Sequence, residues 1–515
     1  MTEVGRRATR SARGADPVVR PGARVVVAGI GVAGYAAADA LVDVGARVRV
    51  LDARDDDRNR ARAAVLEVIG VDVRLGSGAA DTLPDDVDLV VTSPGWRPTS
   101  PVLEQAVLRG VPVWGEVELA WRLRPVRAEG TYAPWLAVTG TNGKTTTVQM
   151  LDEMLRAAGL RSAAVGNVGT PVLDAVRHPE PYDVLAVELS SFQLHTTWSM
   201  SAQAAVVLNV APDHLNWHGS FEAYRAAKAR VYQLAQLACV YPLTDRGVEQ
   251  LVREADVAPG CRAVSVTDGV PPFGSVGVVD GVLTDRAFVD DGAEQALELG
   301  SVDDIHPLAP HTLADALAAA ALARAHGVPA AAVGAGLRSF RLDEHRGGDV
   351  VAPGLVRWVD DSKATNPHAA QAALSAHPAG HSAAHSAARS AARSAAEPSV
   401  VWIAGGLAKG AAFDELVTGV RDRLRGAVLI GRDRAVLAEA LRRHAPEVRV
   451  IEVGDGETGS EVMDRAVAGA LGLAEPGDTV LLAPACASQD LFRDYAERGD
   501  AFAAAVRTHT RAAPD

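Results

Sequence analysis

The chain has 515 residues, of which 48% are hydrophobic and 22% are charged, and its formal net charge is -13. This length suggests about three domains, which can bury sizeable cores without disulfides. The acidic balance argues against a nucleic-acid-binding surface, and no apolar run approaches the ~20 residues that span a membrane. The three cysteines lack CxxC spacing, which argues against a disulfide framework and a structural zinc site. We therefore expect a cytoplasmic protein, with residues 1–20 as a flexible basic tail rather than a secretory signal.

The first predicted region, residues 21–122, opens with a βαβ unit. The strand RVVVAG leads through a GxGxxG loop, Gly29 to Gly34, into a helical segment and a second strand that closes at Asp52. Such a loop brings backbone N–H groups close to a diphosphate at the N-terminus of the helix. A nicotinamide dinucleotide and a UDP-sugar both carry a diphosphate, so the loop alone leaves both ligands open.

The second predicted region, residues 123–342, contains the strands WLAVTG, YDVLAVELSS and AAVVLNVAP. Apolar runs that stop at polar residues are typical of parallel strands covered by helices on both faces. The loop TGTNGKTT, residues 139–146, joins the first of these strands to a helix and indicates a phosphate-binding loop. Lys144 would lie beside the β- and γ-phosphates, and the Thr145 hydroxyl would ligate Mg²⁺. The loop departs from the common GxxxxGK[ST] pattern because Val138 stands where the first glycine is expected.

The third predicted region, residues 343–515, contains five candidate strands with helices between them. The segment DDSKATN follows one strand, and Gly405 and Gly406 with Lys409 follow another. Ligands bind at the carboxyl edge of parallel sheets, so these strand ends suggest a third ligand. An Ala/Ser-rich stretch at 376–398 interrupts the region. We interpret it as an inserted surface loop, because its sparse histidines suit no metal chelate.

Five motifs follow one another along the chain: TGTNGKTT, ELSSFQL, DHL, DSKATN and PACAS. With these motifs the chain resembles the Mur ligase family over about residues 22–506. The resemblance implies a three-domain α/β fold, with a Rossmann-like N-terminal domain, a central P-loop-type ATPase domain with a mostly parallel sheet, and a Rossmann-like C-terminal domain. It also implies ATP-dependent amide formation through an acyl phosphate, with two Mg²⁺ ions as cofactors.

Within the family, DSKATN and PACASQDLF resemble the members that add D-glutamate to UDP-N-acetylmuramoyl-L-alanine, a cytoplasmic step of peptidoglycan precursor synthesis. The Asp-Asn-Pro-Arg motif usual in the relative that adds a diamino acid does not occur here. The expected partners are therefore these two small substrates, with neither nucleic acid nor membrane, and the chain is expected to be a monomer.

The resemblance also implies roles for the residues at matching positions. By the resemblance, the catalytic residues would be Lys144, Glu188, His214 and Lys228. The metal ligands would be Thr145, Glu188, His214 and, if it is carbamylated, Lys228. ATP would contact Gly140, Thr141, Asn142, Gly143, Lys144, Thr145, Thr146, Arg346 and Asp361. The UDP-containing substrate would contact Gly31, Val32, Ala33, Asp52, Arg54, Ser93, Asn167, Ser190 and Gln193. D-glutamate would contact Lys363, Thr365, Lys409, Ser488 and Tyr495.

Two departures and three alternatives remain at this point. Thr312 and Asp315 stand in a motif that is often His-Asn-x-x-Asn in the family, which leaves the adenine contact open, and Asn216 replaces the usual Asp after DHL. Another amino-acid ligase of the family is one alternative, although the folate polyglutamate type would leave the UDP-type domain unused. An NAD-dependent oxidoreductase would leave TGTNGKTT and DSKATN without a role. The intact set of predicted catalytic residues argues against a nucleotide sensor with degenerate chemistry.

Overall fold

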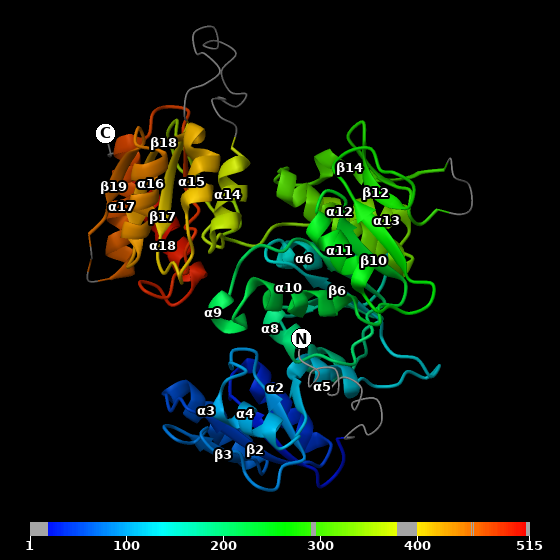
Figure 1. Ribbon diagram of the computed structural model, residues 1–515. Coiled ribbons are helices and arrows are strands. Elements are labelled where there is room, and N and C mark those ends of the chain that lie inside the picture. The colour runs from blue at the N-terminus through cyan, green and yellow to red at the C-terminus, as the bar shows by residue number, and fades with distance from the viewer. Residues whose placement is uncertain (1–18, 290–294, 378–398, 455, 457, 511–515) are drawn as a thin grey trace. The chain divides into compact units, whose positions relative to one another are not determined.

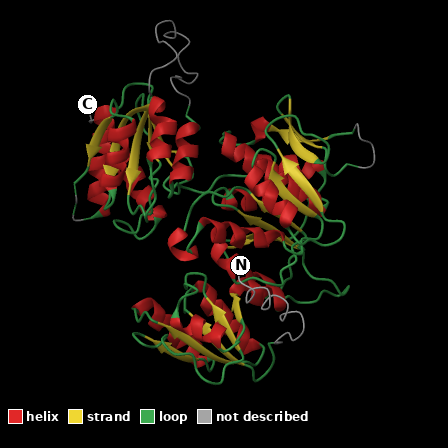
Figure 2. Ribbon diagram, in the orientation of Figure 1, coloured by secondary structure: helices red, strands yellow, loops and turns green. Residues whose placement is uncertain are grey.

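The computed structural model describes residues 19–289, 295–377, 399–454, 456 and 458–510 (Figure 1). By its internal contacts the chain divides into two compact units, Met1–Asp304 with Ala314–Phe340, and Ile305–Leu313 with Arg341–Asp515. Both units are α/β structures in which helices cover parallel-rich sheets (Figure 2). Almost all of the predicted N-terminal tail and of the predicted insert lies outside the described residues.

The first sheet is entirely parallel, in the order β3-β2-β1-β4-β5. Its strands are β1 (Arg24–Ala28), β2 (Arg47–Asp52), β3 (Asp72–Leu75), β4 (Leu89–Thr92) and β5 (Val113–Gly115), and its helices are α2 (Val32–Asp43), α3 (Asp57–Val68), α4 (Pro101–Leu108) and α5 (Glu116–Arg122). Val25 and Val27 belong to the core cluster that contains α2, whereas Val26 and Ala28 pack with α4. Helices therefore cover both faces, which explains why β1 is apolar at almost every position.

The second sheet has the order β14-β13-β12-β11-β10-β9-β6-β8-β7. Its strands are β6 (Trp135–Thr139), β7 (Ser162–Gly166), β8 (Val184–Glu188), β9 (Ala204–Val207), β10 (Ala238–Pro242), β11 (Arg262–Val266), β12 (Ser275–Val279), β13 (Val282–Asp285) and β14 (Leu297–Ser301). The strands from β7 to β12 pair in parallel, and β13 and β14 extend the sheet with antiparallel pairing. The sequence indicated only the strands around β6, β8 and β9.

The helices of this part of the first unit connect its strands and cover the sheet (Figure 1). They are α6 (Lys144–Ala157), α7 (Val172–Val176), α8 (Ser191–His195), α9 (Leu215–His218), α10 (Phe221–Ala229), α11 (Arg246–Glu254), α12 (Pro310–His326) and α13 (Ala330–Ser339), with 3-10 turns η1 (Arg230–Tyr232) and η2 (Val302–Asp304). One hydrophobic cluster runs from β1 through α5 and α7 to β6 and β8. The two sheets of the first unit therefore share a continuous core.

Two buried carboxylates fix α5 against the second sheet of this unit. Glu116 accepts a hydrogen bond from the backbone N–H of Leu173 at 2.6 Å, next to the start of α7. Glu118 accepts hydrogen bonds from the backbone N–H groups of Trp198 at 2.7 Å and Ser199 at 2.9 Å. Both side chains are almost fully buried. Because buried carboxylates must be hydrogen-bonded, these contacts hold α5 in one position.

The third sheet, in the second unit, has the order β15-β16-β20-β17-β18-β19. Its strands are β15 (Gly348–Asp349), β16 (Arg357–Asp360), β17 (Val400–Gly405), β18 (Leu424–Ile430), β19 (Arg449–Glu452) and β20 (Thr479–Leu482), and its helices are α14 (Pro367–Ser375), α15 (Asp414–Val420), α16 (Arg434–His444), α17 (Gly459–Leu473) and α18 (Tyr495–Thr510), with a 3-10 turn η3 (Arg421–Arg423). The five strands predicted here are confirmed. One core cluster joins the sheet to α14, α15 and α16, and another joins it to α17 and α18.

Two of the three cysteines lie close together in space although 22 positions separate them in the sequence. Cys239 on β10 and Cys261, just before the neighbouring strand β11, have their sulfur atoms 3.9 Å apart. Both are free thiols, as is Cys486. Within the described residues no group of three or more His, Cys, Asp or Glu side chains is arranged to hold a metal ion. No helix among them is long and apolar enough to cross a membrane.

Candidate active site

The predicted phosphate loop joins β6 to α6, as the sequence indicated. Gly143 precedes the helix with a φ of 83°, in the left-handed region that favours glycine. A Cβ atom at this position would overlap Oδ1 of Asp315, so a side chain is excluded by space as well. The N-cap residue of α6 is therefore a glycine, which has no side chain to cap the helix. Backbone N–H groups at a helix N-terminus favour an anion, such as a phosphate.

Two residues that the sequence reading missed hold this loop in place. The backbone N–H of Asn142 donates to Oδ1 of Asn209 at 2.9 Å, and Nδ2 of Asn209 donates back to the Asn142 carbonyl at 3.2 Å. The hydroxyl groups of Thr141 and Tyr224 lie 2.9 Å apart, and Thr141 Oγ1 also accepts from the Ala211 backbone at 3.0 Å. Asn209 comes two residues after β9, and Tyr224 lies one helical turn before Lys228. These two positions in the sequence are the features that could have identified Asn209 and Tyr224 as site residues.

Glu188 is at the centre of the polar contacts around the loop. It ends β8, and its pairing with Val138 on β6 places it beside the loop. Its side chain is only 1% exposed. Thr145 Oγ1 donates to Oε2 of Glu188, and Nδ2 of Asn167 donates to Oε1, each at 2.8 Å. The structure thus brings together three residues predicted from separate motifs.

Two lysine side chains approach the same loop. Nζ of Lys144 donates to the Thr141 carbonyl at 2.9 Å, and Nζ of Lys228 donates to the Gly140 carbonyl at 2.6 Å. Lys228 is only 2% exposed. Burial, followed by the positive charge of Lys144, lowers the pKa of Lys228 well below its ordinary value, and Asp213 and Glu188 only partly oppose this. The site therefore favours a neutral amine at Lys228.

His214 lies among aromatic side chains at the start of α9. Its backbone is left-handed, with a φ of 53°, and its ring centroid lies 4.7 Å from that of Phe192 on α8. Nε2 of a second histidine, His218, lies 2.9 Å from Ser191 Oγ. Burial, reinforced by neighbouring cationic groups, lowers the pKa of His218 to about 4. His218 is therefore neutral at physiological pH, and the sequence reading did not single it out.

Ser190 and Gln193, predicted to contact the substrate, interact with each other. Oε1 of Gln193 accepts from both the backbone N–H and the hydroxyl of Ser190 at 2.9 Å, and Ser190 Oγ accepts from the Gln193 backbone at 3.2 Å. This is a capping box at the N-terminus of α8. The S-x-x-Q spacing in ELSSFQL could have revealed this local structural role from sequence.

A cavity of about 730 Å³ opens beside the glycine loop of the first sheet. All six residues predicted there to contact the UDP-containing substrate line it: Gly31, Val32, Ala33, Asp52, Arg54 and Ser93. Both carboxylate oxygens of Asp52 accept backbone hydrogen bonds, from Ile30 at 3.0 Å and from Arg54 at 2.9 Å. Asp52 thus orders the loop, and each of its oxygens keeps a lone pair for a ligand donor.

The residues predicted to contact D-glutamate all belong to the second unit. Lys363 and Thr365 follow β16, Ser488 follows β20, and Lys409 follows β17. These three strands are neighbours in the sheet, so their carboxyl ends lie at one edge. Nζ of Lys363 lies 3.8 Å from the centroid of the Tyr495 ring.

Two further features at this edge concern single side chains. Ser488 Oγ is buried and has no hydrogen-bond partner among the described residues. Burial and the neighbouring Asp360 carboxylate raise the pKa of Asp361 to about 7, and Arg346 opposes this shift. Arg346 and Asp361, both predicted to contact ATP, therefore interact electrostatically within the second unit.

Comparisons with known proteins identify the family. A family model described as Mur ligase middle domain matches residues 138–267, and one described as Mur ligase MurD-like, N-terminal domain, matches residues 23–115. The UDP-N-acetylmuramoylalanine–D-glutamate ligase of Streptomyces coelicolor is 57% identical over 486 residues, which cover 94% of this chain and 98% of the relative. The chain belongs to the Mur ligase family. The ligase of the same name from Thermobifida fusca is 51% identical, again over 94% of this chain and 98% of the relative.

Solved structures of other Mur ligases share the fold at low sequence identity. UDP-N-acetylmuramate-alanine ligase from Thermotoga maritima is similar with a TM-score of 0.52 and 19% identity, covering 93% of this chain and 98% of that chain. The MurF ligase from the same organism, solved in complex with ADP, gives a TM-score of 0.51 and 14% identity, covering 96% of this chain and 100% of that chain. At such identities the likeness concerns the fold alone.

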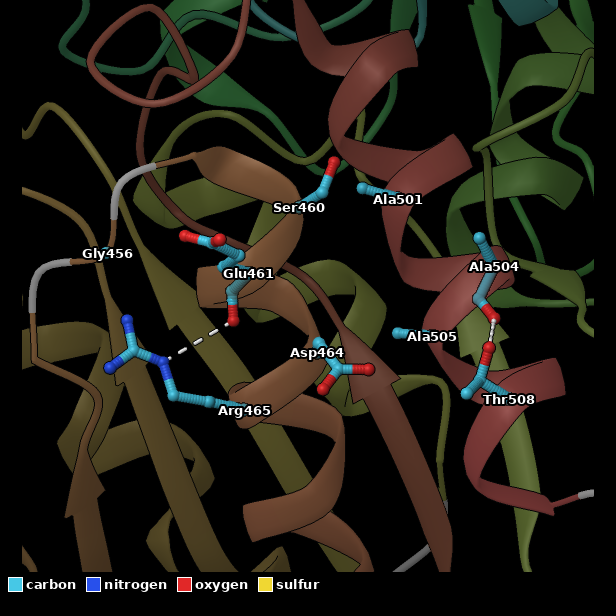
Figure 3. A pocket seen from close by; sticks show the side chains of 9 residues that line it. All are labelled: Gly456, Ser460, Glu461, Asp464, Arg465, Ala501, Ala504, Ala505 and Thr508. Carbon is cyan, nitrogen blue, oxygen red and sulfur yellow. Dashed lines mark hydrogen bonds between the residues drawn. The ribbon is translucent and has the colours of Figure 1, made fainter.

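A second cavity in this Mur ligase lies between α17 and α18 and has a volume of about 920 Å³ (Figure 3). The polar side chains that line it make contacts within the protein. Arg465 Nε donates to the Glu461 carbonyl at 3.4 Å, and Thr508 Oγ1 donates to the Ala504 carbonyl at 3.0 Å. Asp464 Oδ1 lies 2.9 Å from Nε2 of His509. None of the residues predicted to bind ligands lines this cavity, so it is not the candidate active site.

Proposed function

We propose that this Mur ligase joins D-glutamate to UDP-N-acetylmuramoyl-L-alanine, with ATP converted to ADP and phosphate, as a cytoplasmic step of peptidoglycan precursor synthesis. The observation that carries the proposal is the 57% identity to the Streptomyces coelicolor UDP-N-acetylmuramoylalanine–D-glutamate ligase over 98% of its length. The phosphate loop and the charge arrangement around it support the same conclusion.

The proposal assigns one substrate to each of three domains. Residues 21–122 would bind the UDP-containing substrate, residues 123–342 would bind ATP, and residues 343–515 would bind D-glutamate. The three separate sheets support this division, as does the placement of predicted ligand contacts at a cavity or a strand edge of each. We also propose that the enzyme acts as a monomer.

The reaction requires two anions to meet. The carboxylate of the substrate attacks the γ-phosphorus of ATP, giving an acyl phosphate and ADP. The amine of D-glutamate then attacks the acyl carbon, phosphate leaves, and the amine loses a proton as the amide forms. In this scheme the N-terminus of α6 and the ammonium group of Lys144 offset the negative charge of the phosphates.

The donor set around Glu188 fits Mg²⁺. Thr145 and Glu188 offer a hydroxyl and a carboxylate oxygen 2.8 Å apart, and Mg²⁺ prefers such oxygen ligands. When bound, Mg²⁺ would offset phosphate charge. We propose Thr145 and Glu188 as ligands of one ion, and His214 with a carbamate on Lys228 as ligands of a second.

The environment of Lys228 supports a carbamate on this residue. A carbamate forms when a neutral amine attacks CO₂ and releases one proton, which turns a cation into an anionic oxygen ligand. The lowered pKa of Lys228 favours the neutral amine that this step needs. Its nearly complete burial would also protect the product from water. The expected signature is a carbamate resonance in ¹³C NMR of enzyme supplied with ¹³C-bicarbonate, absent in the Lys228→Met variant.

An amino-acid panel tests the proposed function most directly. With UDP-N-acetylmuramoyl-L-alanine present, phosphate release from ATP should require an added amino acid, and D-glutamate should far exceed D-alanine, L-lysine and diaminopimelate. An acidic side chain can pair with Lys363 and Lys409, whereas a basic one would meet their like charges. Comparable turnover with L-lysine would refute the choice of amino acid and favour a different ligase of the family.

The Lys363→Ala variant adds a control on the site itself. We expect a higher KM for D-glutamate or a lower kcat, with less effect on the KM for ATP. If the variant responds to D-glutamate as the unmodified enzyme does, Lys363 does not contact this substrate.

A further inference from the structure

A tight turn after β4 places two hydrogen-bond donors next to the glycine loop of the first sheet. The turn is closed by the Trp96 backbone N–H, which donates to the Ser93 carbonyl at 3.1 Å, and Ser93 itself donates to the Ala28 carbonyl at 2.9 Å. A Cβ atom built on Gly29 would lie 2.6 Å from Nε1 of Trp96 and 2.8 Å from Oγ of Ser93. The indole N–H and the hydroxyl therefore lie together over the first glycine of the loop.

The indole ring of Trp96 is held by packing. The ring is partly buried and packs against the core cluster that contains Val26 and Ala28. Its nitrogen carries one donor and no acceptor, and it makes no hydrogen bond to any residue that the structure describes. Trp96 also lines the cavity of about 730 Å³ beside α2. An N–H group that is held in place at the wall of a cavity can donate a hydrogen bond to an acceptor atom of a ligand.

The hydrogen-bond donors around the Trp96 indole suit an anionic acceptor, in a lining that carries two arginines and two aspartates. Arg54 and Arg97 line the same cavity, and no described side chain caps the N-terminus of α2 at Gly31. One carboxylate of the lining, Asp52, accepts backbone hydrogen bonds on both oxygens. The other carboxylate of the lining, Asp81, would repel a bound anion. Several hydrogen-bond donors are therefore needed to hold the anion there.

We propose that the Trp96 indole N–H donates a hydrogen bond to the diphosphate of the UDP-containing substrate, which makes Trp96 a specificity-determining residue for this substrate. The assignment rests on the proposed function. The diphosphate is favoured over the uracil ring because Nε1 lies against Gly29, the glycine that begins the phosphate-type turn. The GxGxxG spacing does not indicate Trp96, because Trp96 follows a separate strand, β4.

The test compares Trp96→Phe with the unmodified enzyme, because phenylalanine keeps an aromatic ring and removes the donor. Calorimetric titration should show at least tenfold weaker binding of UDP by the variant and unchanged binding of uridine, which has no phosphate. The KM for UDP-N-acetylmuramoyl-L-alanine should rise by a similar factor, while kcat and the KM for D-glutamate stay within about twofold. Trp198→Phe is the matched control, since Trp198 lies outside the cavity, and it should bind UDP normally.

The outcomes separate this assignment from the proposed function. Unchanged UDP binding by Trp96→Phe, with the unmodified enzyme active in the amino-acid panel, would overturn the assignment alone. An equal loss of UDP and uridine binding would also overturn it, because the indole would then contact the base. Unchanged ATP binding by the variant shows that it is folded. A second variant, Trp96→His, retains a ring N–H and should recover part of the UDP affinity; no recovery would contradict the role of the donor.

Discussion

Replacing Lys144 with methionine tests the phosphate-loop assignment with little risk to folding. Methionine keeps an unbranched side chain of similar size and removes the ammonium group. Nζ of Lys144 donates a hydrogen bond to the Thr141 carbonyl at 2.9 Å. Its loss should cost about 1 kcal/mol. For the first unit, Met1–Asp304 with Ala314–Phe340, that corresponds to a decrease in Tm of about 1–2 °C.

The effect of the same change on catalysis should be much larger. The ammonium group is proposed to offset charge on the transferring phosphate, and one preorganised donor of this kind contributes about 10²–10³ in kcat. Because Lys144 carries a full charge, we expect a loss at or above the upper end of this range. Phosphate release with all three substrates measures kcat, and thermal unfolding measures stability.

A matched variant separates charge from shape at this position. Lys144→Arg keeps the positive charge but adds a planar guanidinium group to a tight loop, so it should also lose most activity. Near-normal turnover of Lys144→Met, with a Tm close to that of the unmodified enzyme, would refute the placement of a phosphate at this loop.

Three further predictions concern stability, the insert and the second lysine. Burial raises the pKa of Glu116 to about 7, so the free energy of unfolding should fall by about 3 kcal/mol as the pH rises from about 4.5 to 7. Glu116→Gln should remove this dependence in urea unfolding measured across that range; an unchanged pH slope would contradict the shift. Deleting residues 376–398, which lie almost entirely outside the described residues, should leave kcat nearly unchanged, and a hundredfold loss in a folded variant would show that the insert takes part. Lys228→Arg should abolish turnover and the carbamate resonance, because a guanidinium group stays protonated; retained turnover would exclude a carbamate role.

The strands that the sequence did predict have a local signal, whereas the parallel strands β7, β10 and β11 were missed. β1, β6 and β8 are apolar on both faces, and this pattern arises directly from coverage by helices on both sides. The antiparallel extension from β12 to β14 was missed. A tight turn at Gly281 joins β12 to β13, and β13 pairs antiparallel with both β12 and β14. Their place in the sheet depends on pairing with β11, which no local pattern specifies.

The candidate site was predictable where a motif is continuous in sequence and less so where it depends on the register of strands. TGTNGKTT marks the loop directly, but the 2.8 Å contact between Thr145 and Glu188 follows from the pairing of β6 with β8. Tyr224 was missed because its role depends on a hydroxyl contact with Thr141, 83 residues away. In the second unit, β20 lies between β16 and β17 although it comes last in the chain. This order, which chain position does not reveal, brings Ser488 to the edge that also carries Lys363.

Lysine occurs at few positions in this chain, and these positions lie in both units. Lysine and arginine together account for 51 residues, and lysine occurs only at positions 144, 228, 363 and 409. All four positions are predicted site residues, so arginine supplies every cation elsewhere in the chain. Lysine differs from arginine in having a compact charge, and burial can shift its amine to the neutral form, whereas a guanidinium group remains charged. A phosphate loop with little space at Gly143, beside Lys144, and a buried amine at Lys228 each need one of these properties. The use of lysine therefore follows the chemistry proposed for each position.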